Sequence, residues 1–212
     1  MHKTKIDWCD YTWNPVWGCL NSCPYCYARA TARRWGLSFE PHWRERNFNR
    51  PMPKEPDARI FVNSMSEMAY WKPEWWERVI GRIIENPQHT FIFLTQDPSI
   101  YVKWMQLPPR NCWLGATATT QLAVKIAQQT LALMRPEWIT FLSIEPILQA
   151  IDPAQIDTDA VRWVILAAET GNLADRVVPP LEWIKPFLGL KIPLYMKRNI
   201  PWDGPWRKEF PA

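Results

Sequence analysis

Three cysteines stand within eight residues of one another near the start of the sequence, as Cys19, Cys23 and Cys26. Their spacing is Cys-x3-Cys-x2-Cys, and the aromatic Tyr25 directly precedes the last of them. Three thiolates on one short loop can bind three irons of a 4Fe–4S cubane and leave the fourth iron open. An open metal position is a place for chemistry, whereas a site closed by four protein ligands is structural. The cysteine loop, residues 18–28, therefore predicts a reactive iron–sulfur centre.

A zinc site is the alternative interpretation of the same loop, with Cys9, His2 or His42 as the fourth ligand. Zinc sites more often pair two Cys-x2-Cys arms, and the sequence has no second arm. The five cysteines are an odd number, and in a reducing compartment their crowding indicates metal binding rather than a disulfide framework. Cys9 and Cys112 are interpreted as ordinary residues, and Cys112 as a small buried hydrophobe.

The cysteine loop resembles that of the radical S-adenosylmethionine superfamily, in its spacing, its aromatic residue and its place ahead of a βα series. The resemblance implies that Cys19, Cys23 and Cys26 hold a 4Fe–4S cluster whose open iron chelates S-adenosylmethionine, close to Tyr25. One electron, from a donor of the flavodoxin or ferredoxin type, would then cleave this cofactor. The resulting 5′-deoxyadenosyl radical would remove a hydrogen atom from the substrate.

A second resemblance covers most of the chain and is carried by residues 7–8, 11–16, 61–66, 93–95, 113–115 and 141–146. These segments are similar to a phage and bacterial family of small three-cysteine proteins, whose genes often neighbour one for a "three-Cys-motif partner" protein. The chain departs from that family at Gln96 and Asp97, where a Lys-Arg pair is usual. It also has Ala-Ala-Glu-Thr-Gly at 167–171 for the usual Gly-Gly-Glu-Ser-Gly, and a shorter gap between the first two cysteines.

The elements that must position these residues alternate between short apolar runs and helical patterns. Six runs, apolar on both faces, predict strands of a buried parallel sheet at 59–63, 89–95, 112–116, 139–143, 162–167 and 192–196. Helices are predicted over 73–86 and 120–134, and weaker ones over 28–35 and 181–188, the last kinked or ended by Pro186. The fold class is therefore α/β, a partial (β/α)6-type parallel barrel of the radical S-adenosylmethionine kind. One domain is expected over residues 1–212.

Polar residues that follow these strands are the candidate cofactor-binding residues, because parallel folds bind ligands beyond the carboxyl ends of their strands. Those selected are Ser64, Ser66, Glu67, Thr117, Ser143, Glu145 and Glu169. The superfamily resemblance implies that the first three hold the methionyl end of S-adenosylmethionine. The alternative for Glu145 and Glu169 is that they cap helices or pair with Arg162, Arg176 or Lys197. The strand-end rule also selects Asn63, Thr95, Gln96, Thr119, Lys197 and Arg198.

The remaining features bear on partners and location. Apolar residues make up 47% of the chain and charged residues 22%, which is the balance of a globular protein and excludes a disordered or fibrous one. The sequence lacks a secretory signal and an apolar run that could span a bilayer, so a cytoplasmic protein without a membrane partner is expected. Basic and aromatic residues alternate in 29–35, 42–50 and 197–208, and the net charge is +4. These segments favour a nucleic acid or nucleotide substrate.

Three classes of function stay open at this point. The first is a radical enzyme that modifies or repairs its substrate. The second is a zinc-stabilised nucleic-acid-binding module without catalysis. The third is a cluster-bearing subunit of an enzyme whose partner protein performs the reaction.

Overall fold

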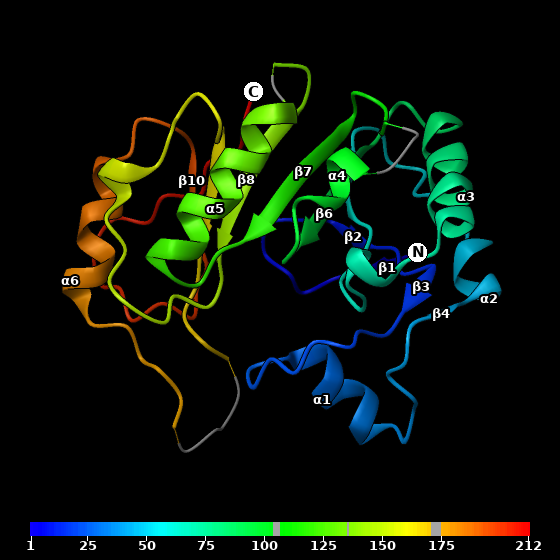
Figure 1. The fold of residues 1–212 in the computed structure, drawn as a ribbon, viewed down its shortest axis with the longest axis horizontal. Coiled ribbons are helices and arrows are strands. Elements are labelled where there is room, and N and C mark those ends of the chain that lie inside the picture. The colour runs from blue at the N-terminus through cyan, green and yellow to red at the C-terminus, as the bar shows by residue number, and fades with distance from the viewer. Residues whose placement is uncertain (104–106, 135, 171–174) are drawn as a thin grey trace. The chain divides into compact units, whose positions relative to one another are not determined.

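The computed structural model describes residues 1–103, 107–134, 136–170 and 175–212, without the side chain of His2. The chain is mixed α/β and divides into two compact units, residues 1–113 and 114–212. Figure 1 colours the chain by residue number, from blue at the N-terminus to red at the C-terminus. The expectation of one domain stays a prediction. Among the described residues, no helix is both long and apolar enough to cross a membrane.

The main strands of unit 1 pair in the order β1-β2-β5-β6. Their bounds are β1 His2–Lys3, β2 Tyr11–Thr12, β5 Arg59–Phe61 and β6 Thr90–Thr95. β2, β5 and β6 run parallel, with Ile60 opposite Phe91, whereas β1 pairs with β2 in the antiparallel sense. Most residues of β5 and β6 are buried, as expected for strands that are apolar on both faces.

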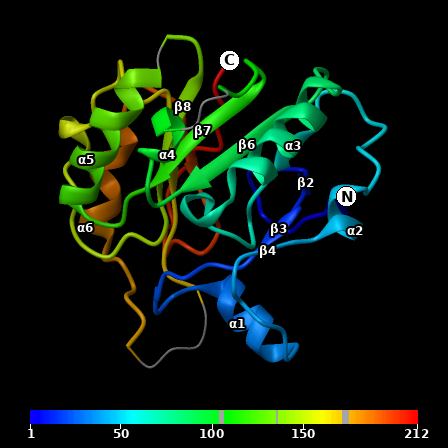
Figure 2. The same cartoon turned by 45° about the vertical axis from the view of Figure 1, so that its right-hand side comes forward.

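The other elements of unit 1 surround this sheet. They are β3 Val16–Trp17, α1 Tyr27–Arg34, β4 His42–Trp43, α2 Glu45–Phe48, the 3-10 turn η1 Met68–Tyr70, α3 Pro73–Ile84 and α4 Ile100–Lys103. β3 and β4 form a separate antiparallel pair. α3 starts with a proline in its first turn and buries Trp76, Val79 and Ile80. Figure 2 shows α1 well apart from α3.

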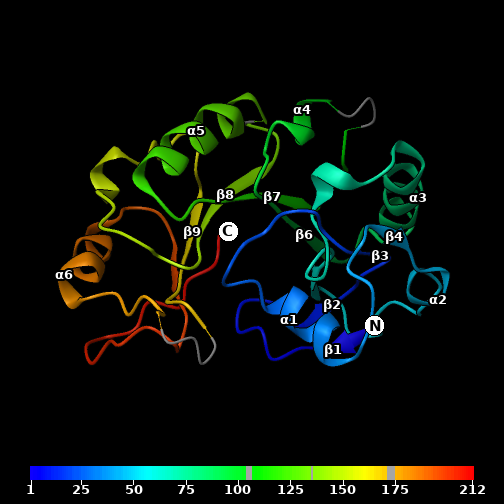
Figure 3. The same cartoon turned by 60° about the horizontal axis from the view of Figure 1, so that its bottom comes forward.

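The strands of unit 2 pair in the order β7-β8-β9-β10. Their bounds are β7 Cys112–Thr117, which begins in unit 1, β8 Ile139–Ile144, β9 Trp163–Leu166 and β10 Leu194–Met196. β8, β9 and β10 are parallel, with Leu142 opposite Val164 and Leu194 also opposite Val164. The helices are α5 Gln121–Leu131 and α6 Leu181–Ile184, with 3-10 turns η2 Ala132–Met134, η3 Pro153–Gln155 and η4 Lys185–Gly189. Figure 3 shows α5 and α6 outside the strands of this unit.

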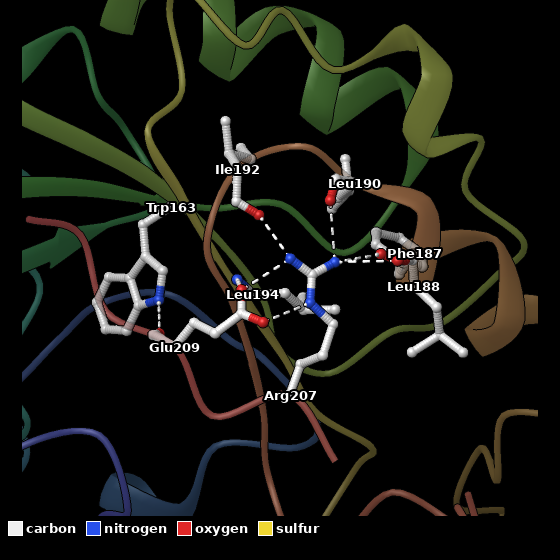
Figure 4. Close-up of polar contacts among 8 residues, drawn as sticks. All are labelled: Trp163, Phe187, Leu188, Leu190, Ile192, Leu194, Arg207 and Glu209. Atoms are coloured by element: carbon white, nitrogen blue, oxygen red, sulfur yellow. Dashed lines mark hydrogen bonds and ion pairs between the residues drawn. The ribbon is translucent and has the colours of Figure 1, made fainter. Parts of the chain in front are cut away.

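Arg207 and Glu209 form hydrogen bonds to several backbone groups of unit 2, and we call this pair the C-terminal clamp (Figure 4). The Arg207 guanidinium donates to the carbonyls of Phe187, Leu188, Leu190 and Ile192 and to the Glu209 carboxylate. Glu209 accepts from the backbone N–H of Leu194, and its carbonyl accepts from Trp163 Nε1. Leu194 and Trp163 are the first residues of β10 and β9, so the clamp ties down the amino ends of these strands.

All six predicted strands are present, so the prediction of an α/β chain with parallel strands is confirmed. The helices predicted over 73–86 and 120–134 are α3 and α5 with η2. The predicted helix over 181–188 changes at Ile184 from α6 to η4, whose first turn contains Pro186, as expected for a proline that lacks an N–H. Cys112 is fully buried, as expected for a small hydrophobe. The two-residue strands β1 to β4 were missed.

Candidate functional site

The start of the cysteine loop is fixed by backbone hydrogen bonds on two sides. Gly18 N–H donates to the Met65 carbonyl at 2.9 Å, and the Gly18 carbonyl accepts from Glu67 N–H at 3.4 Å. These bonds attach the loop to the segment that follows β5. On the other side, Cys19 N–H donates to the Phe39 carbonyl at 2.9 Å. The first cysteine therefore stands between two backbone segments that the fold already positions.

Gly18 is the residue that permits this close approach. Its φ angle is +100°, a conformation that L side chains rarely adopt. A Cβ atom built on Gly18 would lie 2.2 Å from the carbonyl oxygen of Glu40. Because that neighbour is backbone, a side chain here would force the loop or residues 39–41 to move.

A small apolar cluster packs against the cysteine loop. Trp17, Ala28 and Met65 are buried together, and the partly buried Cys26 and Phe39 pack against them. Cys26 is also the N-cap of α1, where its Sγ accepts from the backbone N–H of Arg29 at 3.3 Å. The N–H groups at a helix start favour negative charge, so this position suits an anionic ligand such as a metal-bound thiolate. The third cysteine is thus placed by both packing and capping.

Each of the three thiols of the loop accepts one N–H hydrogen bond. Cys19 Sγ accepts from Asn21 N–H at 3.3 Å and Cys26 Sγ from Arg29 N–H, while Cys23 Sγ accepts from the Gln96 side-chain Nε2 at 3.0 Å. All three cysteines are free and half-buried. Burial raises the pKa of the Cys19 thiol to about 11, and the nearby Glu67 carboxylate adds to the rise. N–H groups directed at sulfur are one of the means by which proteins tune a bound iron–sulfur cluster.

Gln96 connects the end of β6 to the cysteine loop through both ends of its side-chain amide. Its Oε1 accepts from Asn21 Nδ2 at 3.1 Å, while its Nε2 donates to Cys23. Asn21 Oδ1 in turn accepts from the Tyr70 hydroxyl at 2.5 Å. The Arg29 guanidinium donates to the carbonyls of Cys19 and Asn21, at 2.8 and 2.7 Å. The strand-end rule selected Gln96, but the sequence contained no signal for its contact with a cysteine 73 residues away.

Glu67, predicted to bind cofactor, is buried and has several protein donors. Its carboxylate accepts from Ala69 N–H at 3.2 Å, from Gln96 N–H at 2.9 Å and from the Thr95 hydroxyl. Burial raises the pKa of Glu67 despite these bonds. Glu67 therefore caps η1 and joins the ends of β5 and β6, a structural role that the sequence did not predict.

The other predicted residues of unit 1 also lie beside the cysteine loop. Ser64 Oγ exchanges hydrogen bonds with the Asn14 side chain, and its carbonyl accepts from the Tyr27 hydroxyl at 2.6 Å. Ser66 Oγ accepts from Trp71 Nε1 at 3.1 Å. Tyr25 is half-buried within the loop itself. A cofactor-binding role for these residues stays a prediction.

The four predicted residues of unit 2 belong to strand ends of that unit. Ser143 and Thr117 are in β8 and β7, and the Ser143 carbonyl accepts from the N–H of Ala118 at 2.9 Å. Ser143 Oγ is fully buried and finds no hydrogen-bond partner among the described residues. Glu145 forms an ion pair with Lys197, which is one of the pairings that the sequence left open.

Glu169 is buried just beyond β9, and its Oε2 accepts from the N–H of Val177 at 3.0 Å. Gly171, the last residue of the segment that departs from the three-cysteine family, lies outside the described residues.

The donor side chains of the cysteine loop suit an iron–sulfur cluster better than a single metal ion. Within the described ranges, no group of three or more His, Cys, Asp or Glu side chains is arranged to hold a single metal ion. The thiolates of a cubane bind different irons, so they need not approach one another as the ligands of one ion do. Three free thiols on one supported loop, each with an N–H donor, fit such a cluster. His42 Nδ1 lies 2.7 Å from the Glu40 carbonyl and Cys9 is buried against Ile6, while the His2 side chain lies outside the described residues.

The comparisons with known proteins place the chain in a family. The family model described as "Protein of unknown function (DUF5131)" matches residues 3–187, so the chain belongs to that family. No curated protein and no solved structure matches the chain significantly.

Proposed function

We propose that this member of the DUF5131 family is a radical S-adenosylmethionine enzyme. The observation that carries the proposal is the cysteine loop, in which Cys19, Cys23 and Cys26 are free, half-buried and each supplied with an N–H donor. These three thiolates would hold a 4Fe–4S cluster. When bound, the cluster would supply the electron for reductive cleavage of S-adenosylmethionine and so the means of abstracting hydrogen from a substrate.

The chain's own residues have three tasks in this proposal. Gly18 and Cys26 set the course of the loop, through the backbone bonds to Met65 and Glu67 and through the cap of α1. Gln96 and the backbone N–H groups of Asn21 and Arg29 compensate negative charge on the sulfurs. The burial of Trp17 and Met65 beneath the loop restricts the access of water from that side.

The cofactor would be held by polar groups at the strand ends, as in other parallel folds. In unit 1 the candidates are Ser64, Ser66 and Glu67, with Tyr25 in the cysteine loop. The strand ends of unit 2 carry a separate set of candidates, Thr117, Ser143, Glu145 and Glu169. Ser143 is the candidate best able to form a new hydrogen bond, because its buried hydroxyl lacks a partner within the part of the chain that the structure describes. A buried hydroxyl without a partner costs free energy unless a ligand supplies one.

The proposed substrate class is a nucleic acid or nucleotide, and the proposed location is the cytoplasm, where cysteine thiols stay reduced. A flavodoxin or ferredoxin would supply the electron. A second candidate function is a cluster-bearing subunit that works with a three-Cys-motif partner protein. The zinc-stabilised module is the less favoured candidate, because zinc sites more often pair two Cys-x2-Cys arms and the sequence has no second arm.

The deciding experiment is anaerobic reconstitution followed by iron, sulfide and zinc quantitation. We expect a brown protein with about four irons per chain, as for a cubane. Replacing Cys19, Cys23 or Cys26 by alanine abolishes the colour, whereas the matched control C9A, a buried cysteine outside the loop, leaves it unchanged. A colourless protein with stoichiometric zinc contradicts the proposal.

The enzyme class is then tested by 5′-deoxyadenosine release under a strong reductant. Release by the isolated chain supports the radical enzyme, and release only in the presence of the three-Cys-motif partner supports the subunit alternative. A cluster-loaded chain that releases none, alone or with that partner, contradicts both.

A further inference from the structure

One stretch of unit 1, residues 27–50, has a surplus of positive charge, and we call it the basic segment. It contains six arginines and two glutamates, a surplus of four charges. The arginines are Arg29, Arg33, Arg34, Arg44, Arg46 and Arg50. A surplus of this size attracts an anionic partner.

Several of these arginines are not used by the fold. Arg33, Arg34 and Arg46 are exposed and form no ion pair with any residue that the structure describes. One of the two glutamates, Glu45, is engaged by Arg78 of α3 at 2.8 Å, and this contact holds the pKa of Glu45 at about 2. Charges that have no internal partner are available to phosphates.

An exposed tryptophan stands beside Arg33 and Arg34. Trp35 is the C-cap of α1 and follows directly after Arg34, and 61% of its surface is exposed. Its ring stacks on the buried Trp17 of β3, with centroids 6.4 Å apart and planes at 26°. The Arg44 guanidinium lies 4.3 Å from the Trp17 ring centroid. The Trp35 ring thus packs on Trp17, and its exposed surface can stack on a further partner.

The second basic–aromatic stretch, 197–208, differs from the basic segment because its basic side chains contact partners within the fold. Lys197 pairs with Glu145, and Arg207 belongs to the C-terminal clamp. Lys208 lies over the rings of Tyr195 and Trp206, at 4.5 and 5.3 Å. Trp206 is therefore an exposed tryptophan without the free arginines that accompany Trp35.

We infer that the basic segment binds single-stranded nucleic acid, with a base stacked on Trp35 and phosphates contacted by Arg33 and Arg34. A single strand is required because the bases of a duplex are already stacked and cannot offer a face to the ring. This inference deepens the proposed function, since it names the substrate class, and it rests on that function for the link to the cysteine loop. α1 supplies the link: Cys26 caps its start and Trp35 its end. Its eight residues span about 12 Å, roughly three stacked nucleotides.

Binding can be measured without any cluster, by fluorescence anisotropy of labelled dT and rU oligonucleotides with the full chain over a range of salt concentrations. We expect W35A to weaken binding about tenfold, as for the loss of one base–aromatic stack, and W35F to retain most of it. In the double variant R33A/R34A, the slope of log affinity against log salt falls by about 1.4, at about 0.7 per phosphate contact. The matched control W206A binds as the wild type does. Circular dichroism confirms that each variant is folded.

Several outcomes overturn the inference. They are absence of binding by the wild type, equal loss in W206A and W35A, or tighter binding of a duplex than of a single strand. A dimer in sedimentation that W35A dissociates would assign the ring to a second copy of this chain instead. The enzyme proposal is judged separately, by 5′-deoxyadenosine release from the cluster-loaded wild type when no nucleic acid is present. Release without any nucleic-acid binding overturns this inference and leaves the enzyme proposal standing, whereas binding without release does the reverse.

Discussion

Polar contacts hold the strands of unit 1 at their carboxyl ends and the strands of unit 2 at their amino ends. In unit 1 the densest polar network lies at the carboxyl ends of β5 and β6, where Glu67 and Gln96 bind one another and the cysteine loop. In unit 2 the C-terminal clamp secures the amino ends of β9 and β10 instead. Ligands bind at carboxyl ends in parallel folds. Stability and site therefore depend on the same residues in unit 1 and on different residues in unit 2.

This difference predicts how variants behave. A change in the unit 1 network should alter both folding and the thiol site. A change in the unit 2 clamp should reduce stability alone, and Ser143 at the carboxyl end of β8 should influence ligand binding with little effect on stability.

The largest effect is expected for G18A, which places a Cβ 2.2 Å from the Glu40 carbonyl oxygen and requires a strained φ. We expect the free energy of unfolding to fall by about 4 kcal/mol, from overpacking and strain together, and the iron content to fall with it. The matched control is G36A, whose φ is also positive but whose Cβ meets nothing within 4 Å, and it should lose only about 1 kcal/mol. Urea unfolding and iron analysis measure both quantities. Equal losses in the two variants would contradict the role given to the close approach.

The C-terminal clamp gives the next effect. R207A leaves four carbonyls and the Glu209 carboxylate without their donor, so we expect the free energy of unfolding to fall by about 3 kcal/mol with normal iron content. R162A, an exposed arginine, serves as the control and should change stability by less than about 0.5 kcal/mol. Loss of iron in folded R207A would contradict the claim that the C-terminal clamp affects stability alone.

The same clamp predicts a dependence on pH. Hydrogen bonding to Arg207 lowers the pKa of Glu209 below its ordinary value of 4.5. Its stabilisation is therefore complete above pH 4.5 and is lost as the pH falls through the lowered value. Urea midpoints should show a smaller acid-induced decline in E209Q than in the wild type. Parallel curves for the two proteins would assign the acid sensitivity to other groups.

A smaller effect is expected for Q96L, which removes the N–H donor of Cys23. Loss of a hydrogen bond to sulfur favours the oxidised cluster, so the reduction potential of the reconstituted protein should fall by about 40 mV, the one-electron equivalent of about 1 kcal/mol. Redox titration followed by electron paramagnetic resonance measures it. Q149L, a change at an exposed glutamine of unit 2, should leave the potential unchanged. An unchanged potential in Q96L would show that this contact does not tune the cluster.

The smallest change in stability is expected for S143A. Because the Ser143 hydroxyl has no partner among the residues described, its removal loses no hydrogen bond and should leave the free energy of unfolding unchanged or slightly raised. S66A, which deprives Trp71 Nε1 of its acceptor, should lose about 1 kcal/mol. Weaker S-adenosylmethionine binding by S143A, measured by equilibrium dialysis, would assign the hydroxyl to a ligand. Unchanged binding would remove Ser143 from the proposed site.

The sequence predicted the strands and long helices because each buries a continuous apolar run or stripe, as in β8 and α3. It could not predict β1 to β4, since two-residue strands show no periodicity. The cysteines were evident from their spacing alone. The contact of Gln96 with Cys23 was not, because it joins residues 73 apart through the fold. Arg207 and Glu209 resemble ordinary surface charges in the sequence, and only the turn around Leu190 shows which carbonyls they serve.

The cysteine loop is held on several sides by protein contacts, through Gly18, Phe39 and the cap of α1. Ordering a backbone residue costs about 1 to 2 kcal/mol of conformational entropy, and these contacts offset part of that cost. To the extent that they do, the binding energy of iron is not spent on ordering the loop and is expressed as tighter metal binding.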